Sequence, residues 1–527
     1  MRIVTSKQFN LAAKPYVQTL AFFADDTQAR HAYKRLLGMP AVTVLTLLND
    51  ESDAVDGVVF FEQHAKSVKL LLSIQRDNLN RHHVYQKLMR WFSQQRITDL
   101  VVQLTANYAD QHYLLSHGFT KLGNNSYQKH FTYPVGLVLG GGGAHGAFET
   151  GVFDVLMEHN VVPNNIVGVS VGAIMGVSLL HLDSSQAHET WATLTTQKVY
   201  QTQKVGLTTL DFSITIADHL LRGNYFQKAS LRKILEPVVA KELATPPLVK
   251  FALVATEYPK LRATVFDITP QTKNAELVDW ILASSAFYPI VDPVEINGKK
   301  YIDGGYSDNV PIAVSARQGS KIIYAVSIME NSLMNAKVPA DVEVHMIKPA
   351  WPLGPLLDFI PALSREYTRL GEIRTRQVLG EYAGYYYALT ADTDFSWLGH
   401  KLISTLASEP VTATIAVAVQ KPAVKLAFKL WLEQTAQQPL GDDDRQYGLA
   451  IIERLAKRLE LDKFKLYTSA EFIDAIVAAG QTKHAELGLP TKTITTAQVL
   501  ANPEIILLGV LYVLSKQAKK GIMKVIN

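Results

Sequence analysis

The pattern of apolar and polar positions differs between three successive regions of the chain. Up to about residue 133, short apolar runs alternate with helical patterns, which predicts a small α+β domain over residues 1–133. Two helices are predicted there, one near residues 84–92 and one that ends at residues 116–118, because Gly commonly terminates a helix. The predicted strands lie at residues 41–47, 57–61, 68–72 and 99–104.

Residues 134–380 alternate continuous apolar runs with helix-like segments. Strands that are apolar on both faces are typical of a parallel sheet covered by helices on each side. The pattern therefore predicts an α/β domain with a mainly parallel sheet. The apolar runs lie at residues 135–139, 165–169, 250–256 and 321–326.

The third region, residues 381–527, is predicted to be a mostly helical domain. Thr468 and Glu471 have the spacing of a capping box, which marks the start of a helix. An apolar stripe at helical spacing supports the same conclusion. It is formed by Leu449, Ile452, Leu455 and Leu459.

The longest uninterrupted apolar run, residues 505–514, is too short for a bilayer-spanning helix, which needs about 18 apolar residues. As a helix, residues 505–526 would place lysines on one side and apolar side chains largely on the other. This pattern fits a helix that lies on an anionic membrane surface. It also fits a terminal helix that docks on the protein and keeps its lysines in solvent.

Composition excludes several classes of chemistry. The 527 residues hold 52 Lys and Arg against 48 Asp and Glu, a balance that argues against nucleic acid as the main partner. The chain has no cysteine, which excludes disulfides, thiolate metal sites and a cysteine nucleophile. The sequence indicates no metal site, and it gives no sign of the oligomeric state. Because no secretory signal pattern is visible, we expect a cytoplasmic protein.

A run of glycines at residues 140–146, Gly-Gly-Gly-Gly-Ala-His-Gly, follows a predicted strand directly and precedes a helix. Successive N–H groups can converge there on an anion, and the helix dipole adds to their field. A tight turn that needs positive φ would give the same pattern. A nucleotide-binding loop is disfavoured, because the run lacks a Gly-Lys-Ser/Thr ending.

Ser170 lies in a Gly-Val-Ser-Val-Gly motif between a predicted strand and the start of a helix. That context fits a nucleophile elbow, in which the flanking Gly168 and Gly172 tolerate a strained turn that exposes the hydroxyl. The alternative is an ordinary serine in a glycine-rich turn.

A third motif, Asp303-Gly304-Gly305, follows the strand-like residues 299–302 and by itself indicates only a turn. The glycine loop, the serine motif and this motif stand in the order that characterises the patatin-like phospholipases. The chain resembles that family over roughly residues 134–380. Segments at residues 255–257, 283–289 and 307–311 resemble further landmarks of the family.

The resemblance implies a patatin-like three-layer α/β/α sandwich and a serine lipid acyl hydrolase, of the phospholipase A or lysophospholipase type, that needs no cofactor. It implies a Ser–Asp dyad, in which Ser170 attacks the ester carbonyl, Asp303 accepts its proton, and the acyl-enzyme is then hydrolysed. The amides of Gly141, Gly142 and Gly143 would stabilise the oxyanion. Two alternatives stay open: acyl transfer to an alcohol, and a regulatory or sensor protein with a residual hydrolase site.

The chain departs from the family at His145, where Arg or Lys is common beside the oxyanion loop. A histidine supplies a comparable charge only when it is protonated. The alternative is that His145 packs or hydrogen-bonds to hold the loop. The remaining supporting residues of the expected site are Gly168, Gly172, Gly304 and Gly305.

The N-terminal region resembles the second half of a GNAT-type acetyltransferase, most clearly at residues 113–119. The pyrophosphate-binding loop of that family should hold closely spaced glycines, and residues 75–83 contain none. We therefore expect a degenerate GNAT-like domain used for sensing or contact. The expected partner of the whole chain is a phospholipid or other ester lipid, with peripheral contact at the inner membrane surface if residues 505–526 bind lipid.

Overall fold

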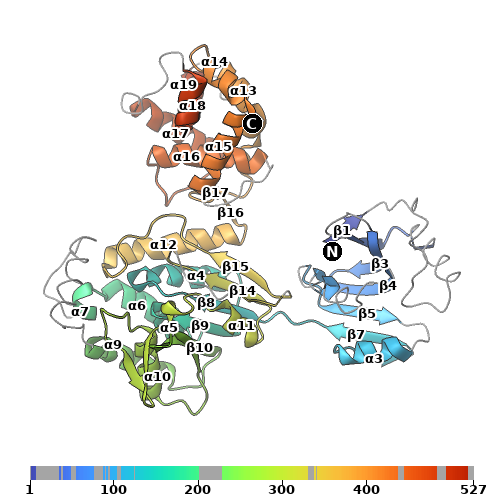
Figure 1. Ribbon diagram of the computed structural model, residues 1–527, viewed down its shortest axis with the longest axis vertical. Helices are drawn as coiled ribbons and strands as arrows, with labels where there is room; N and C mark the ends of the chain where they lie inside the picture. The colour runs from blue at the N-terminus through green and yellow to red at the C-terminus, as the bar shows by residue number, and fades with distance from the viewer. Residues whose placement is uncertain are drawn as a thin grey trace.

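The computed structural model describes three successive regions of the chain (Figure 1). The described residues are 2–6, 35–36, 39–48, 55–75, 87–89, 91–92, 95–103, 108–123, 125–200, 228–329, 337–339, 341–436, 444–483 and 494–519.

The N-terminal region is a seven-stranded sheet in the order β1-β2-β3-β4-β5-β7-β6, in which only β4 and β5 pair in parallel. The predicted α+β character is confirmed. Of the predicted helix at residues 84–92, the described residues 87–89 and 91–92 are helical, and the others lie outside the described residues. The elements are β1 (Arg2–Ser6), β2 (Val42–Leu48), β3 (Val55–His64), β4 (Ser67–Gln75), β5 (Asp99–Gln103), α3 (Tyr108–Ser116), β6 (Thr120–Gly123) and β7 (Ser126–His130).

The central region is built on an eight-stranded sheet with the order β12-β13-β10-β9-β8-β14-β15 and with β11 paired to β10. Five adjacent strands, β10, β9, β8, β14 and β15, run parallel to one another. The strands β11, β12 and β13 add antiparallel pairs. The strands are β8 (Val135–Leu139), β9 (Asn165–Val169), β10 (Lys250–Tyr258), β11 (Arg262–Asp267), β12 (Val294–Ile296), β13 (Lys299–Asp303), β14 (Ile322–Val326) and β15 (Glu343–Ile347).

Both faces of this sheet are covered, which confirms the predicted α/β/α layers. Alternate residues of β8 separate to opposite sides: Leu137 and Leu139 pack in the larger core under the helices, and Val138 packs in a smaller core with residues of α11. Each such side chain stabilises the fold by roughly 1.5–3 kcal/mol through burial. The helices are α4 (Ala147–Glu158), α5 (Val171–Ser178), α6 (Ser185–Thr193), α7 (Thr196–Tyr200), α9 (Lys228–Glu242), α10 (Asn274–Ser284), α11 (Ile312–Arg317) and α12 (Pro361–Val378), with short 3₁₀ turns η2 (Gly143–Gly146) and η3 (Gly304–Tyr306).

Helices α12 and α4 lie side by side and approach each other through glycines (Figure 1). A Cβ on Gly371 would lie 2.1 Å from the Phe148 carbonyl oxygen, and one on Gly151 would lie 1.9 Å from that of Thr368. The Thr368 hydroxyl also donates to the Ala147 carbonyl at 3.0 Å. Since α4 begins directly after the glycine loop, α12 supports the loop from behind.

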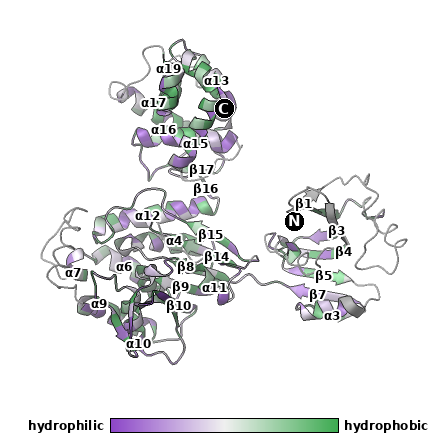
Figure 2. Cartoon of the chain, in the orientation of Figure 1, coloured by the Kyte–Doolittle hydropathy of each residue, from purple (hydrophilic) through white to green (hydrophobic). Residues whose placement is uncertain are grey.

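The C-terminal region is mostly helical, as predicted, with its own buried core. The predicted capping box of Thr468 and Glu471 is present at the start of α17. Helices α17 and α19 are largely hydrophobic in Figure 2. The elements are β16 (Tyr382–Ala383), β17 (Ala388–Thr390), α13 (Ser396–Ala407), α14 (Ala413–Val419), α15 (Pro422–Ala436), α16 (Asp444–Arg458), β18 (Leu466–Tyr467), α17 (Ser469–Thr482), α18 (Thr496–Ala501) and α19 (Glu504–Lys519).

The apolar run at residues 505–514 packs inside this core, which agrees with the docked-helix alternative rather than with burial of this run in lipid. Ile506, Val510 and Leu514 of α19 are fully buried, and Lys516 at its end is exposed. The rest of the proposed lipid-binding segment, residues 520–526, lies outside the described residues. The alternative of a docked terminal helix therefore holds for the described part of α19.

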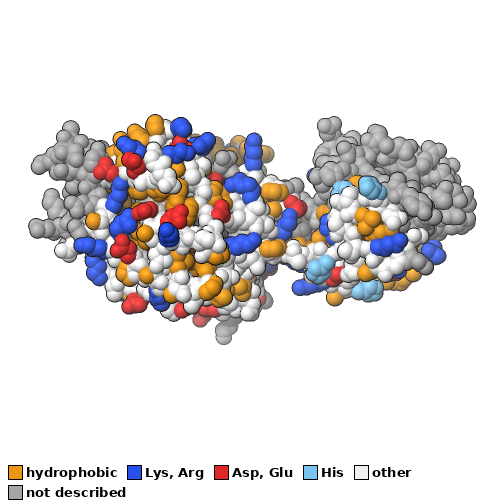
Figure 3. Space-filling model, turned by 90° about the horizontal axis from the view of Figure 1, so that it is seen from below, with side chains coloured by type: hydrophobic (Ala, Val, Ile, Leu, Met, Phe, Trp, Pro, Cys, Tyr) orange, Lys and Arg blue, Asp and Glu red, His pale blue; other side chains and the backbone are white. Residues whose placement is uncertain are grey.

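No helix in the described part of the chain combines the length and the apolar character needed to cross a membrane. On the face shown in Figure 3, the described Lys and Arg side chains are interspersed with acidic and apolar ones. That distribution agrees with the nearly even charge balance of the sequence.

The close approach of α12 to α4 leads to a stability prediction. Replacing Gly371 with Ala should lower the free energy of unfolding by about 1–3 kcal/mol, because the added methyl meets backbone that cannot yield without separating the helices. Arg365→Ala, at an exposed position of the same helix, should change it by less than about 0.5 kcal/mol. Urea unfolding followed by circular dichroism measures both. Equal stability of the Gly371 variant and the unmutated protein would contradict so close a helix contact.

Candidate active site

Two strand registers bring the serine motif and the aspartate motif to the same level of the sheet. Val169, the last residue of β9, pairs with Val254 of β10. The next residue of β10, Ala255, pairs with Asp303 at the end of β13. Ser170 directly follows Val169, so it lies across β10 from Asp303. The Ser170 side chain lies close enough to the Asp303 carboxyl to favour its ionised form.

The glycine loop reaches the same edge because β8 runs parallel to β9 and ends beside it, with Leu139 paired to Gly168. Residues 141–143 line one cavity together with Ser170 and Asp303. The fold thus brings together three motifs that are spread over more than 160 positions of the sequence, 303 − 140 = 163.

Ser170 has a strained backbone that its glycine neighbours make possible. Its φ of 53° and ψ of −121° lie outside the regions that non-glycine residues ordinarily adopt, which costs about 1–3 kcal/mol. A Cβ on Gly168 would lie 2.3 Å from the Gly172 oxygen, and one on Gly172 would lie 2.2 Å from the Leu139 oxygen. The motif therefore needs glycine at both flanking positions, and α5 starts directly after the serine.

Ser284, at the end of α10, holds the strained turn in place. Its hydroxyl accepts a hydrogen bond from the Ser170 N–H at 2.9 Å and donates one to the Val254 carbonyl at 2.7 Å. The Ser284 side chain is fully buried. In the sequence, Ser284 stands out only as part of a family landmark at residues 283–289. A serine at the end of a helix does not by itself reveal partners that are distant in the sequence.

Asp303 is a buried carboxyl with few partners, only 5% exposed. Burial raises its pKa to about 6, although the nearby Ser170 side chain and the Gly305 amide, which donates at 2.8 Å, act in the opposite direction. A Cβ on Gly304 would lie 2.1 Å from the Val254 oxygen. Glycine at 304 lets the chain turn against β10 immediately after the carboxyl.

The amides of the glycine loop are not equivalent. The Gly141 N–H donates to the Asn309 carbonyl at 3.4 Å, a long hydrogen bond, and the Ala144 N–H donates to the Leu356 carbonyl at 2.7 Å. Between them, the N–H groups of Gly142 and Gly143 have no acceptor among the described residues. Their amides are therefore the loop's free hydrogen-bond donors beside Ser170.

Asn309 clamps the glycine loop to the aspartate motif. Its side-chain amide donates to the Gly141 carbonyl at 3.1 Å, and its backbone carbonyl faces the Gly141 N–H. A Cβ on Gly141 or Gly305 would lie 2.5 or 2.7 Å from the Asn309 Oδ1. This residue, too, was visible in the sequence only as part of a landmark.

His145 holds the loop through two backbone carbonyls. Its Nδ1 lies 3.3 Å from the Ile328 oxygen and its Nε2 lies 3.0 Å from the Gly354 oxygen. Its ring packs edge-on against Tyr367. Burial lowers the pKa of the imidazole, while the contacts with the two carbonyls favour the protonated form. These contacts are the ones expected for a histidine that holds the loop.

A cavity of about 340 Å³ opens beside Ser170 and is lined mainly by apolar side chains. Among its described lining residues, Asp303 and Lys228 carry the only charges, and the Lys228 ammonium donates to the Pro293 carbonyl at 2.6 Å. No group of three or more His, Asp or Glu side chains in the described residues is placed to hold a metal ion. The shape and lining suit an extended hydrocarbon group.

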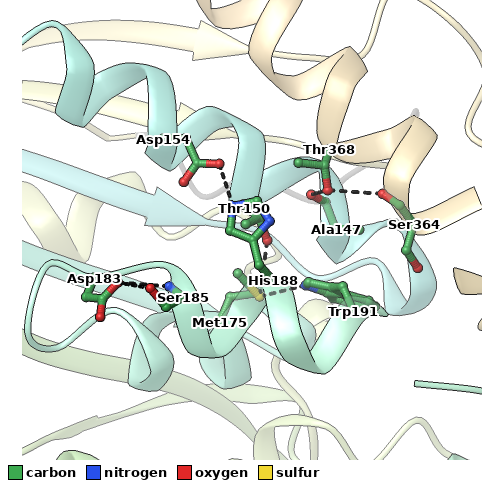
Figure 4. A network of polar contacts seen from close by, with 10 residues as sticks. All are labelled: Ala147, Thr150, Asp154, Met175, Asp183, Ser185, His188, Trp191, Ser364 and Thr368. Carbon is green, nitrogen blue, oxygen red and sulfur yellow. Dashed lines mark hydrogen bonds and ion pairs between the residues drawn. The ribbon is translucent and has the colours of Figure 1, made fainter. Parts of the chain in front are cut away.

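One wall of this cavity is fixed by contacts to a sulfur atom (Figure 4). The Trp191 indole N–H donates to the Met175 sulfur at 3.1 Å, and the Thr150 hydroxyl lies 4.0 Å from the same atom. An ion pair between His188 and Asp154, at 2.8 Å, ties α6 to α4 on the outside. Together these contacts hold α6 against the helix that follows the glycine loop.

The two hydrogen bonds of Ser284 lead to a second prediction. Ser284→Ala should lower the free energy of unfolding by about 1–3 kcal/mol, because it leaves the Ser170 N–H and the Val254 carbonyl without their partner. The neighbouring Ser285 is a matched control, since its hydroxyl has no hydrogen-bond partner among the described residues. Ser285→Ala should leave stability nearly unchanged in urea titrations of both variants. A larger loss at Ser285 than at Ser284 would refute the assigned support.

Comparisons with other proteins place the central region in a known family. Residues 137–315 match the family model described as patatin-like phospholipase. An uncharacterised NTE family protein of Mycobacterium tuberculosis is 32% identical over 195 residues, which are 37% of this chain and 49% of that protein. Neuropathy target esterase sws of Drosophila melanogaster is 27% identical over 254 residues, 47% of this chain and 16% of that protein. The chain thus spans about half the length of the mycobacterial relatives, and less of the insect protein.

Among solved structures, VipD from Legionella pneumophila has a TM-score of 0.31 and 13% identity, covering 75% of this chain and 94% of that one. Tetrahymena GCN5 has a TM-score of 0.17 and 14% identity, covering 21% of this chain and 78% of that one. The family assignment rests on the matched sequence region and on the sheet that carries the three motifs. Residues 137–315 of this chain match the patatin-like phospholipase family.

Proposed function

We propose that this protein is a serine lipid acyl hydrolase that cleaves the acyl ester of a phospholipid or lysophospholipid. The observation that carries the proposal is the placement of Ser170 and the buried Asp303 side by side at one apolar cavity. A strained serine, a buried base and free backbone donors around one point are the parts that acyl transfer needs. Matched relatives named as lysophospholipases agree with this substrate class.

In the proposed reaction, the Ser170 oxygen attacks the ester carbonyl while Asp303 accepts the hydroxyl proton. The N–H groups of Gly142 and Gly143, together with that of Gly141, would stabilise the tetrahedral oxyanion. One such donor is worth about 2.7–4 kcal/mol in comparable sites. The protonated Asp303 then gives its proton to the departing alcohol, and the carboxylate activates water to hydrolyse the acyl-Ser170.

Burial of Asp303 makes a dyad without histidine chemically reasonable. An ordinary aspartate is too weak a base to accept a serine proton efficiently, whereas a pKa of about 6 keeps most of the carboxyl ionised at pH 7 and makes it a stronger base. His145 is assigned the supporting role, because both its ring nitrogens face backbone carbonyls of other loops.

The cavity supports an acyl chain as the group recognised next to the serine. Its apolar walls would stabilise methylene groups by about 0.8 kcal/mol each on leaving water. We propose a cytoplasmic enzyme that reaches its substrate at a membrane surface. The buried face of α19 does not serve that contact, so other surfaces would meet the lipid.

The function is tested by incubating the purified protein with a panel of phospholipids, lysophospholipids and neutral esters. Mass spectrometry should show released fatty acid from at least one lipid class, and new esters instead would indicate acyl transfer. Ser170→Ala should abolish release and also labelling by a fluorophosphonate probe, while Ser285→Ala should keep both. Labelling of another serine in an active Ser170→Ala variant would overturn the assignment.

The raised pKa of Asp303 predicts how activity depends on pH. The base works only when it is ionised, so kcat/KM on a soluble ester should fall about tenfold per pH unit below about 6 and level off above it. Asp303→Asn keeps the shape but not the base, and turnover should drop by roughly 10²–10⁴-fold. Initial-rate kinetics from pH 4.5 upward, with folding checked by circular dichroism, measure both effects. A near-normal Asp303→Asn variant would point to a different base.

A further inference from the structure

A second cavity, of about 300 Å³, lies between the end of α12 and α16 of the C-terminal region. It shares no described lining residue with the cavity beside Ser170. Its lining is polar and carries two arginines. The lining residues are Arg374, Gln377, Val378, Gly384, Tyr385, Tyr386, Gln446, Leu449, Ala450, Glu453 and Arg454.

Arg374 is a half-buried cation with no acidic partner in contact. Its Nε donates to the Lys348 carbonyl at 3.1 Å and one terminal nitrogen donates to the Gln377 side chain at 3.2 Å. Its guanidinium lies 4.4 Å from the centre of the Tyr385 ring. No described carboxylate lies within 4.0 Å of it, and the second terminal nitrogen has no acceptor among the described residues. Burial of such a cation is costly unless an anion accompanies it.

Arg454 adds a second guanidinium to the same cavity. Its described contact is with the face of the Trp431 ring, 5.4 Å from the ring centre, and no described carboxylate pairs with it. Lys457, one turn further along α16, lies over the Tyr386 ring at 3.9 Å. The proximity of Arg454 lowers the pKa of Lys457, after the larger effect of burial. Positive charge therefore accumulates at this end of α16.

The one acidic residue in the lining, Glu453, is engaged by backbone amides at one of its two oxygens. Its Oε1 accepts the N–H groups of Tyr385, Tyr386 and Tyr387 at 2.9, 2.8 and 2.9 Å. Burial raises its pKa to about 7, although these three donors and the nearby charge of Arg374 act in the opposite direction. The carboxyl fixes the chain between the two regions and leaves the cavity with a net positive charge.

We infer that this cavity binds a phosphate group, carried by a small organic phosphate or by a lipid headgroup. Two guanidinium groups in one pocket suit a tetrahedral phosphate, because each can donate two parallel N–H bonds to its oxygens. The side-chain amide of Gln446 is a neutral donor in the lining, whereas that of Gln377 already donates to the Tyr387 carbonyl at 2.9 Å. A volume of about 300 Å³ exceeds what a lone chloride or water needs and accommodates a phosphate with its substituent.

The test compares matched charge losses in the full chain, in a Ser170→Ala background so that lipid substrates stay intact. Arg374→Gln/Arg454→Gln removes the two cavity arginines. Arg365→Gln/Arg458→Gln removes two arginines from the same helices; Arg365 is exposed, and Arg458 forms a surface ion pair with Glu504. Glycerol 1-phosphate is titrated by calorimetry, and vesicles of phosphatidylcholine doped with phosphatidic acid are assayed by co-sedimentation.

Binding of either probe that is weakened roughly tenfold or more by the cavity variant, and not by the control variant, supports the inference. Glycerol phosphate binding would identify a soluble ligand, and vesicle binding alone would identify a headgroup. Arg454→Gln by itself keeps the test valid if loss of Arg374 unfolds the protein, and it should show a smaller loss of the same kind. Equal loss in both double variants, or no binding of either probe, overturns the inference.

Discussion

The close approach of the turn after β9 to the end of β8 is the constraint on which the site depends. Gly172 lies so near the Leu139 carbonyl that no side chain fits between them, and Gly168 lies equally near the backbone of the turn. This contact forces Ser170 into its strained conformation and sets it beside the glycine loop that leaves β8. The strain persists because the surrounding sheet and the Ser284 hydroxyl define the turn from both sides.

The same packing explains the electrostatics of the site. Asp303 is buried because its strand pairs with β10 and its motif turns immediately against that strand. With no cation among its close partners, desolvation outweighs the effects of the Gly305 amide and the Ser170 side chain, and its pKa rises. The sheltering that makes the carboxyl a better base also strengthens any hydrogen bond that backbone amides make to an oxyanion. Burial of the site thus favours both proton acceptance by Asp303 and stabilisation of the oxyanion by backbone amides in the proposed reaction.

The sequence predicted the central strands well because they are buried on both faces. Residues 135–139 and 165–169 read as uninterrupted apolar runs and became β8 and β9 with the predicted limits. The edge strands β11 and β15 were missed, since they mix polar and apolar residues and their side chains are only partly buried. Edge strands take their structure from a partner elsewhere in the chain, and a local pattern carries no sign of that partner.

The motif residues could be found in the sequence, whereas their supports could not. Glycine runs and a serine between glycines have a local physical meaning. Asn309 and Ser284 act through hydrogen bonds to residues more than 100 positions away, 309 − 141 = 168 and 284 − 170 = 114. The apolar run of α19 shows a different limit: its pattern fits a membrane-surface helix and a docked helix equally, and the tertiary core of the C-terminal region decides that the described part docks.

Helix α12 contacts both the helix behind the glycine loop and the second cavity. Its first half packs backbone against backbone on α4, the helix that starts from the glycine loop, and its last turns carry Arg374 into the polar cavity beside α16. A glycine contact of this kind tolerates little sliding, because any displacement brings carbonyl oxygens into the neighbouring helix. Arg374 therefore lies on the same helix that packs closely against the helix behind the glycine loop.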